Sequence, residues 1–333
     1  MHGVYKKTER QDMKTEVFFA KGTNSKLMAY TNTKDQKVFL PIQQADIAPR
    51  LGEVIIVDKN YDIQEVIQQM FELEIYKKEE VDIGVKEKHI WKPLLIGDMG
   101  KELDYTVYEL CKAKRDLSVL IQKLQEILLY VEPAMNCLQT YSHKLRELLI
   151  LACTEFECCF KGYNFGNNER TSDYVKILEL VDLKKYKIEL AGYSETFQSK
   201  PFATWNPTEP TRSLPWYYAY TQTKHNRTGS FNLATLENCI NAICANIIMF
   251  TIRYSPHSLY NEMDVCSSMV RNTFALRIEN TDDIYIPILE GERSYSGACT
   301  DDISFPNGKM LRQIFDVRKP IPFKDKELDN HAK

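Results

Sequence analysis

The chain has 333 residues, which is enough for about two domains and leaves room for a third. Its apolar content of 44% is that of a globular protein, so a chain disordered throughout is excluded. The net charge of −3 excludes a protein that coats DNA or RNA non-specifically, because such proteins carry a large excess of Lys and Arg. A local basic site remains compatible with that charge.

Location and cofactors are constrained by what the sequence lacks. The first residues, MHGVYKKTERQDMK, have no apolar core, so they do not read as a signal peptide. The most apolar run, residues 239–252, is shorter than the roughly 20 residues that a membrane span needs. The nine cysteines form no CxxC pair and no Cys/His cluster with zinc-ligand spacing. We therefore predict a cytoplasmic protein with no membrane contact, metal or cofactor.

Residues 16–97 are predicted to be rich in β-structure. Short runs of β-branched and aromatic residues, separated by polar turn sequences, predict strands at residues 16–20, 26–30, 37–41 and 53–58. Residues 62–76 then show apolar side chains at helical spacing. Residues 87–97 are predicted to be extended again.

From about residue 101 the apolar period becomes helical and stays so to about residue 254. Long amphipathic helices are predicted at residues 103–131 and 136–160, and a shorter one at residues 172–183. Residues 191–215 are broken by prolines and predict a connecting loop. A last helix is predicted at residues 231–254, with Ser230 as its N-cap.

Beyond Pro256 the pattern again favours strands. Residues 273–278 and 284–289 alternate in polarity, and the turn sequence between them predicts a hairpin, with residues 308–317 as a further strand. The fold class is therefore predicted as α+β, with a central all-helical bundle flanked by small β-rich N- and C-terminal regions. The expected organisation is a β-rich N-terminal domain at 1–98, a helical domain at 99–255 and a hairpin-containing C-terminal region at 256–333.

The segment PWYYAYTQTKHNRTGSF, residues 215–231, carries the main candidate for chemistry. Histidine side chains ordinarily titrate near neutral pH, so His225 is the candidate general acid or base. Lys224 and Arg227 beside it are candidates to hold a phosphate and stabilise developing charge. RNA cleavage without a metal needs these functions: a group that activates the 2′-hydroxyl and a cation near the phosphate.

The aromatic residues just before this basic group have two interpretations. Tyr218, Tyr220 and Trp216 are candidate substrate contacts, because aromatic rings stack on bases. Alternatively, Trp216, Tyr217 and Tyr220 fill a helix interface, and residues 224–227 form a solvated loop. Both interpretations are compatible with the composition of the segment.

The predicted helix at 136–160 supplies a second set of candidates. His143 and Glu147 lie four residues apart and would share one helix face, with Glu155 two turns later. A carboxylate from Glu147 or Glu155 that faced His225 would orient the imidazole, and His143 is a candidate substrate contact. A solvated ion-pair face explains the same spacing. Arg253 and His257 raise a similar choice between a phosphate site and polar residues that end a helix.

The segment WYYAYTQTKHNRTGSFNLATLENCINAICANIIMF resembles a pattern in many uncharacterised bacterial proteins, W-x-x-Y-N-x-x-K-H-x-R followed by A-T-L-x-N and an Ala-rich helix. Thr221 stands where the pattern has Asn. The earlier stretch TYSHKLRELLILACTEFE is also similar to a helix of such proteins, so the resemblance spans residues 136–254. That group is similar to HEPN domains.

The HEPN resemblance implies an all-helical module that acts as a homodimeric, metal-independent endoribonuclease. Such modules occur in toxins, abortive-infection systems and other phage-defence proteins. Their signature places an Arg four to six residues before a His, whereas no Arg lies at that distance before His225. The alternative is therefore a non-catalytic sensor, scaffold or RNA-binding component that works with a partner protein of a defence complex.

Overall fold

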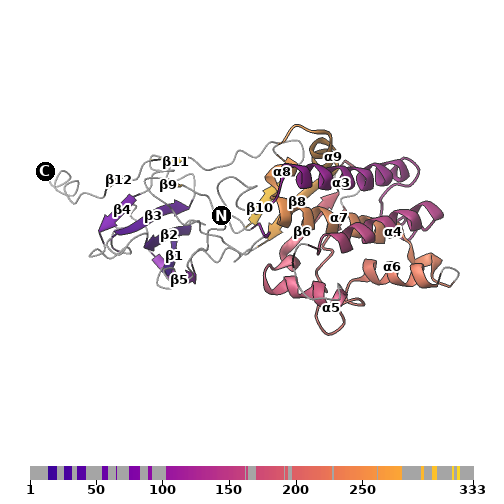
Figure 1. The fold of residues 1–333 in the computed structure, drawn as a ribbon, viewed down its shortest axis with the longest axis horizontal. Coiled ribbons are helices and arrows are strands. Elements are labelled where there is room, and N and C mark those ends of the chain that lie inside the picture. The colour runs from indigo at the N-terminus through magenta and orange to yellow at the C-terminus, as the bar shows by residue number, and fades with distance from the viewer. Residues whose placement is uncertain are drawn as a thin grey trace, which may run out of the picture.

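The computed structural model describes residues 103–161, 163, 170–190, 192–193, 197–226, 229–260 and 262–279. Outside these ranges it describes residues 65 and 89–91 and the backbone of strands β1 to β5 and β9 to β12. Figure 1 shows the helices and strands, coloured from indigo at the N-terminus to yellow at the C-terminus.

Strands of the N-terminal region form a six-stranded sheet with the order β12-β4-β3-β2-β1-β5. Its members are β1 (Lys14–Ala20), β2 (Lys26–Thr31), β3 (Gln36–Ile42), β4 (Ile55–Asp58), β5 (Ile75–Asp82) and β12 (Ile321–Pro322). The four predicted strands are confirmed as β1 to β4. Strand β5 occupies the last residues of the predicted helix at 62–76, most of which lies outside the described residues. β12 pairs parallel with β4, so a strand from the C-terminal region forms one edge of a sheet made otherwise of N-terminal strands.

The helices of the following region surround one apolar helix. They are α3 (Val107–Leu128), α4 (His143–Cys158), α5 (Thr171–Tyr174), α6 (Pro215–His225), α7 (Leu236–Tyr254), α8 (His257–Tyr260) and α9 (Val265–Thr273). Helix α7 is buried on nearly every side, which is the pattern of a helix at the centre of a core. Helices α3, α4 and α6 all pack against it, as Figure 1 shows.

The starts of these helices are set by capping side chains rather than by the first apolar residue. Thr106 and Glu109 form a reciprocal capping box at α3. Ser142 accepts from the Leu145 amide at 3.2 Å, so α4 begins seven residues later than predicted. Thr235 caps α7 in the same way, which makes the predicted N-cap at Ser230 wrong. The residues between them form a short 3-10 turn, η4 (Phe231–Leu233).

A second sheet lies beside the helices, with the order β10-β8-β6-β7. Its strands are β6 (Tyr186–Leu190), β7 (Phe197–Ser199), β8 (Phe274–Glu279) and β10 (Asp302–Phe305). Strand β8 confirms the prediction at 273–278, but it pairs with β6 and β10; the predicted partner at 284–289 lies outside the described residues. The central region is thus a mostly helical core with an antiparallel sheet, and the α+β class is confirmed while the all-helical description is not.

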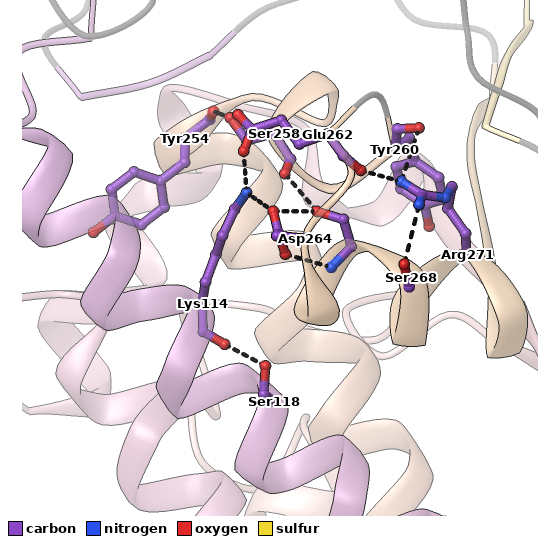
Figure 2. Close-up of polar contacts among 10 residues, drawn as sticks. Lys114, Ser118, Tyr254, Ser258, Tyr260, Glu262, Asp264, Ser268 and Arg271 are labelled. Atoms are coloured by element: carbon purple, nitrogen blue, oxygen red, sulfur yellow. Dashed lines mark hydrogen bonds and ion pairs between the residues drawn. The ribbon is translucent and has the colours of Figure 1, made fainter.

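The buried Lys114 of α3 forms ion pairs with the segment that carries α8 and α9 (Figure 2). The Lys114 Nζ lies 2.5 Å from both Glu262 Oε2 and Asp264 Oδ2. Asp264 also caps α9 by accepting from the Ser267 amide at 2.9 Å. Arg271 donates to the backbone carbonyl of Glu262. We call Lys114, Glu262 and Asp264 the Lys114 cluster.

Within the described residues, no helix is both long enough and apolar enough to cross a bilayer.

Candidate functional site

Helix α6, which sequence analysis did not predict, is anchored through its aromatic residues. Pro215 opens the helix, where its missing N–H leaves no gap in the hydrogen bonding. Trp216 is only 1% exposed, and its Nε1 donates to the Pro201 carbonyl at 2.9 Å. Its ring packs edge-on against Phe156, with the two ring centres 4.9 Å apart. A buried indole with a satisfied N–H cannot stack on a base. The predicted substrate contact of Trp216 is therefore corrected to a packing role.

Contacts at its two ends show that α6 runs antiparallel to α4. Near the start of α6, the Tyr217 hydroxyl donates to the Glu157 carboxylate at 2.6 Å, close to the end of α4. Burial raises the pKa of this phenol, so it stays a protonated donor. Near the end of α6, Arg146 Nη2 donates to the Thr223 carbonyl at 3.2 Å, close to the start of α4. The basic end of α6 therefore lies over the first turn of α4.

Tyr220 supports Lys224 rather than offering a face to substrate. The Tyr220 ring is 2% exposed, and its hydroxyl accepts from Lys224 Nζ at 2.9 Å. The ammonium also lies 5.1 Å from the centre of that ring. The hydrogen bond to Tyr220 raises the pKa of the exposed Lys224 amine, which keeps it charged at neutral pH. Tyr218 is half-buried, with the guanidinium of Arg212 6.0 Å from its ring centre, and remains a candidate contact.

His225 is the exposed last residue of α6. Across the described ranges, no hydrogen bond or ion pair joins its ring to another residue. A cation at this position is favoured by the partial negative charge of the helix C-terminus. Asn226 then turns the chain away, its side-chain oxygen accepting from the Gly229 amide at 3.0 Å. The imidazole is open to solvent, so a substrate can reach it. Arg227 lies outside the described residues.

Two α4 residues extend the basic end of α6. His143, the exposed first residue of α4, stacks at a tilt on Phe231 of η4 with ring centres 4.7 Å apart. Arg146 lies one turn later and reaches the last turn of α6, so both histidines occupy the same end of the helix pair. Arg146 was not among the predicted site residues, although its spacing from His143 places the two on one helix face. The Arg146 Nε is buried without a partner in the described structure.

The two predicted orienting carboxylates do not contact His225. Glu147 faces α3, where its Oε1 lies 2.7 Å from Lys123 Nζ. That hydrogen bond lowers the pKa of the Glu147 carboxyl, so its charge is already matched. Glu155 lies three turns along α4 and lines a cleft between α3, α4 and α7. The predicted catalytic role of Glu147 is therefore corrected to an exposed ion pair between two helices.

Arg253 and His257 do not form the alternative phosphate site. Arg253 donates to the backbone carbonyls of Leu103 at 2.7 Å and Asp104 at 3.1 Å, so its guanidinium ties α7 to the start of α3. Burial lowers the pKa of His257 to about 4, which leaves its ring neutral at pH 7. Arg253 lies in the last turn of α7, whereas His257 begins α8 and places its ring edge-on to Trp91.

Comparison adds no relative: no protein-family model, curated protein or solved structure matches this chain. Among the residues that the structure describes, no group of three or more His, Cys, Asp or Glu is placed to hold a metal ion. The candidate site therefore rests on its own geometry. We call it the α4–α6 end, made of His143, Arg146, Lys224 and His225: two exposed imidazoles and two cations at one end of a helix pair.

Proposed function

We propose that this protein binds RNA at the α4–α6 end and cleaves it without a metal ion. The observation that carries the proposal is the joint exposure of Lys224 and His225 on the last turn of a helix whose other face is locked into the core. Side chains held on a rigid element keep their positions when a polyanion approaches. The resemblance of this segment to HEPN domains supports the same function.

The chemistry needs two proton transfers. A base takes the proton of the 2′-hydroxyl, whose oxygen attacks the adjacent phosphorus, and the bond from phosphorus to the 5′-oxygen breaks as an acid protonates that oxygen. The products are a 2′,3′-cyclic phosphate and a 5′-hydroxyl. We propose His225 as one of the two proton-transfer groups, with His143 at the same end as the second. Lys224 and Arg146 would contact the phosphate, joined by Arg227.

A second candidate function is RNA binding without cleavage, as a sensor or scaffold in a phage-defence complex. It is favoured by the engagement of Glu147 with Lys123, because no described carboxylate then orients the His225 ring. An imidazole that is not oriented by a third group is a weaker acid–base catalyst. The basic surface would still hold a sugar-phosphate backbone.

One experiment separates the two functions. The purified protein is incubated with total tRNA in EDTA, and both cleavage and filter binding are measured for the wild type, His225→Ala and Lys224→Met. Lys184→Met is the matched control, because Lys184 is an exposed lysine on another surface, in the turn before β6. For cleavage, we expect fragments ending in a cyclic phosphate from the wild type and the control, and none from His225→Ala.

Each outcome has a distinct meaning. Binding that falls with Lys224→Met, without cleavage by the wild type, supports the second function. Cleavage by His225→Ala at the wild-type rate contradicts the assigned role of His225. If the wild type neither binds nor cuts tRNA, both functions are wrong. The homodimer implied by the HEPN resemblance is checked on the same sample by light scattering.

A further inference from the structure

A cleft opens between α3, the second half of α4 and the second half of α7, with a volume of about 280 Å³. It lies away from the α4–α6 end, because Glu155 and Cys158 line it. Along the same helix, His143 lies about 18 Å and Arg146 about 14 Å before Glu155, at 1.5 Å per residue. Its volume is near the lower limit of the roughly 300–1,000 Å³ that small-molecule sites occupy.

The inner wall of the cleft is apolar. Leu120 and Met249 are 1% exposed and Phe250 is 5% exposed, and they come from α3 and α7. A wall of this kind favours the hydrocarbon part of a ligand, since the apolar surface of the ligand leaves water.

The cations around the cleft are already matched. Lys112 Nζ lies 2.7 Å from the Asp116 carboxylate. Arg253 is held by two backbone carbonyls, and its guanidinium also lies over the rings of Tyr105 and Tyr254. An anionic ligand would have to compete with these partners for each cation.

Two hydrogen-bond acceptors line the cleft, the Glu155 carboxylate and the Asn246 side-chain oxygen. Glu155 is half-buried in the cleft, and no hydrogen bond or ion pair reaches its carboxylate from the described residues. Asn246 uses its Nδ2 to donate to Ala152 at 2.9 Å and Ala242 at 2.8 Å, which leaves its Oδ1 to accept. Ala152 lies one turn before Glu155 on α4, so Asn246 packs against α4 close to Glu155. Burial and the nearby charge of Asp116 raise the pKa of Glu155, and the charges of Lys112 and Lys161 offset this only in part.

We propose that this cleft binds a small molecule with an apolar body and a cationic, hydrogen-bond-donating head group, such as a primary amine. The body packs on Leu120, Met249 and Phe250. The head group donates to the Glu155 carboxylate and the Asn246 side-chain oxygen. The proposal is independent of the RNA function, because it shares no residue with the α4–α6 end.

The test uses 4-phenylbutylamine as the probe. The control ligands are 4-phenylbutanoate, which is anionic, and 4-phenylbutanol, which is neutral. Binding to the full chain is measured by calorimetry for the wild type, for Glu155→Gln and for Glu126→Gln. Glu126 is an exposed carboxylate on α3 that does not line the cleft, so its variant is the matched control. Glu155→Gln keeps the shape of the side chain, removes its charge and replaces one acceptor oxygen with an NH2 donor.

We expect the wild type and Glu126→Gln to bind the amine at least tenfold more tightly than they bind either control ligand. The Glu155→Gln change should weaken amine binding about tenfold, the loss expected for a hydrogen bond to a charged group. Equal affinity for the three probes, unchanged amine affinity in Glu155→Gln or no binding of the amine would each overturn the proposal.

A second measurement places the probe. Cys158 is exposed and lines the cleft, whereas Cys111 is exposed on α3 outside it. Saturating amine should slow alkylation of Cys158 by iodoacetamide several-fold and leave Cys111 unchanged, as followed by peptide mass spectrometry. Equal protection of both thiols, or of neither, would show that the amine binds elsewhere.

Discussion

Lys114 on α3 and Lys224 on α6 both lie near helix surfaces, yet their surroundings differ. The Lys114 side chain is 10% exposed, and its ammonium lies between two carboxylates that belong to a distant segment (Figure 2). Lys224 is exposed, and its one described hydrogen bond is to a neutral phenol on its own helix. The charge of Lys114 is matched by two carboxylates, and these ion pairs join α3 to the segment that carries α8 and α9. Lys224 is positioned without being neutralised, which leaves its charge available to a ligand.

The largest expected effect is on the matched lysine. Lys114→Met would leave Glu262 and Asp264 facing each other without a cation, and should lower the free energy of unfolding by about 3 kcal/mol. This is the low end for a broken buried pair, because both carboxylates are partly exposed. Lys112→Met is the control two residues earlier: its exposed pair with Asp116 should contribute less than about 1 kcal/mol. Urea unfolding followed by circular dichroism measures both, and equal losses would contradict a special role for Lys114.

The second expected effect is a pH dependence confined to the Lys114 cluster. Burial raises the pKa of the Asp264 carboxyl, but hydrogen bonds from Lys114 and Ser267 outweigh it and the net pKa is lowered. Burial likewise lowers the pKa of Lys114, but hydrogen bonds to Asp264 and Glu262 outweigh it and the net pKa is raised. The stabilisation from Asp264 is thus present above its ordinary pKa and lost as the pH falls through the lower folded value. That from Lys114 is present below its ordinary pKa and lost as the pH rises through the higher folded value.

The difference in unfolding free energy between wild type and Lys114→Met should therefore be widest at intermediate pH. It should narrow below about pH 4 and again above about pH 10. Urea titrations of both proteins at several pH values measure it. A difference that stays constant between pH 3 and pH 7 would show that the cluster contributes packing rather than charge.

The smallest expected effect is on the unmatched lysine. Lys224→Met and His225→Gln should each change the free energy of unfolding by less than about 0.5 kcal/mol, because both residues are exposed and neither ties α6 to another element. Lys224→Met should nevertheless reduce the salt dependence of RNA binding by about one unit of slope in a plot of log affinity against log salt. A loss of stability as large as that of Lys114→Met would remove the contrast between the two lysines.

The parts of this fold that follow local patterns could be predicted from sequence. Strands β1 to β4 are short runs of β-branched and aromatic residues separated by polar turns. Helices α3, α4 and α7 repeat their apolar residues at helical spacing. The predictions that were wrong or missing concerned features set by one of two similar residues, or by a partner far away in the sequence. Thr235 caps α7 although Ser230 is an equally good capping residue. Strand β6 has only five residues, and its pairing with β8, as at Ile188 and Leu276, makes it a strand.

The candidate site divides along the same line. The order of residues in the chain placed Lys224 and His225 side by side. Both are exposed, but they end helix α6 instead of belonging to the solvated loop of the alternative interpretation. The partners of the neighbouring residues could not be read from spacing. Glu147 turns to Lys123 on another helix, and Arg146 reaches Thr223, a residue 77 positions away. Helical spacing gives the face of a residue but not the element that the face meets.

The tryptophans give this molecule a built-in optical reporter. All three, Trp91, Trp205 and Trp216, are at most 3% exposed, so their fluorescence should be blue-shifted in the native protein and move to longer wavelength on unfolding. Trp216 belongs to the helix that presents His225. RNA that docks on a rigid α4–α6 end should leave its emission unchanged, whereas a rearrangement of α6 would expose the indole and shift the spectrum. A single fluorescence titration can therefore distinguish docking from conformational change without any attached dye.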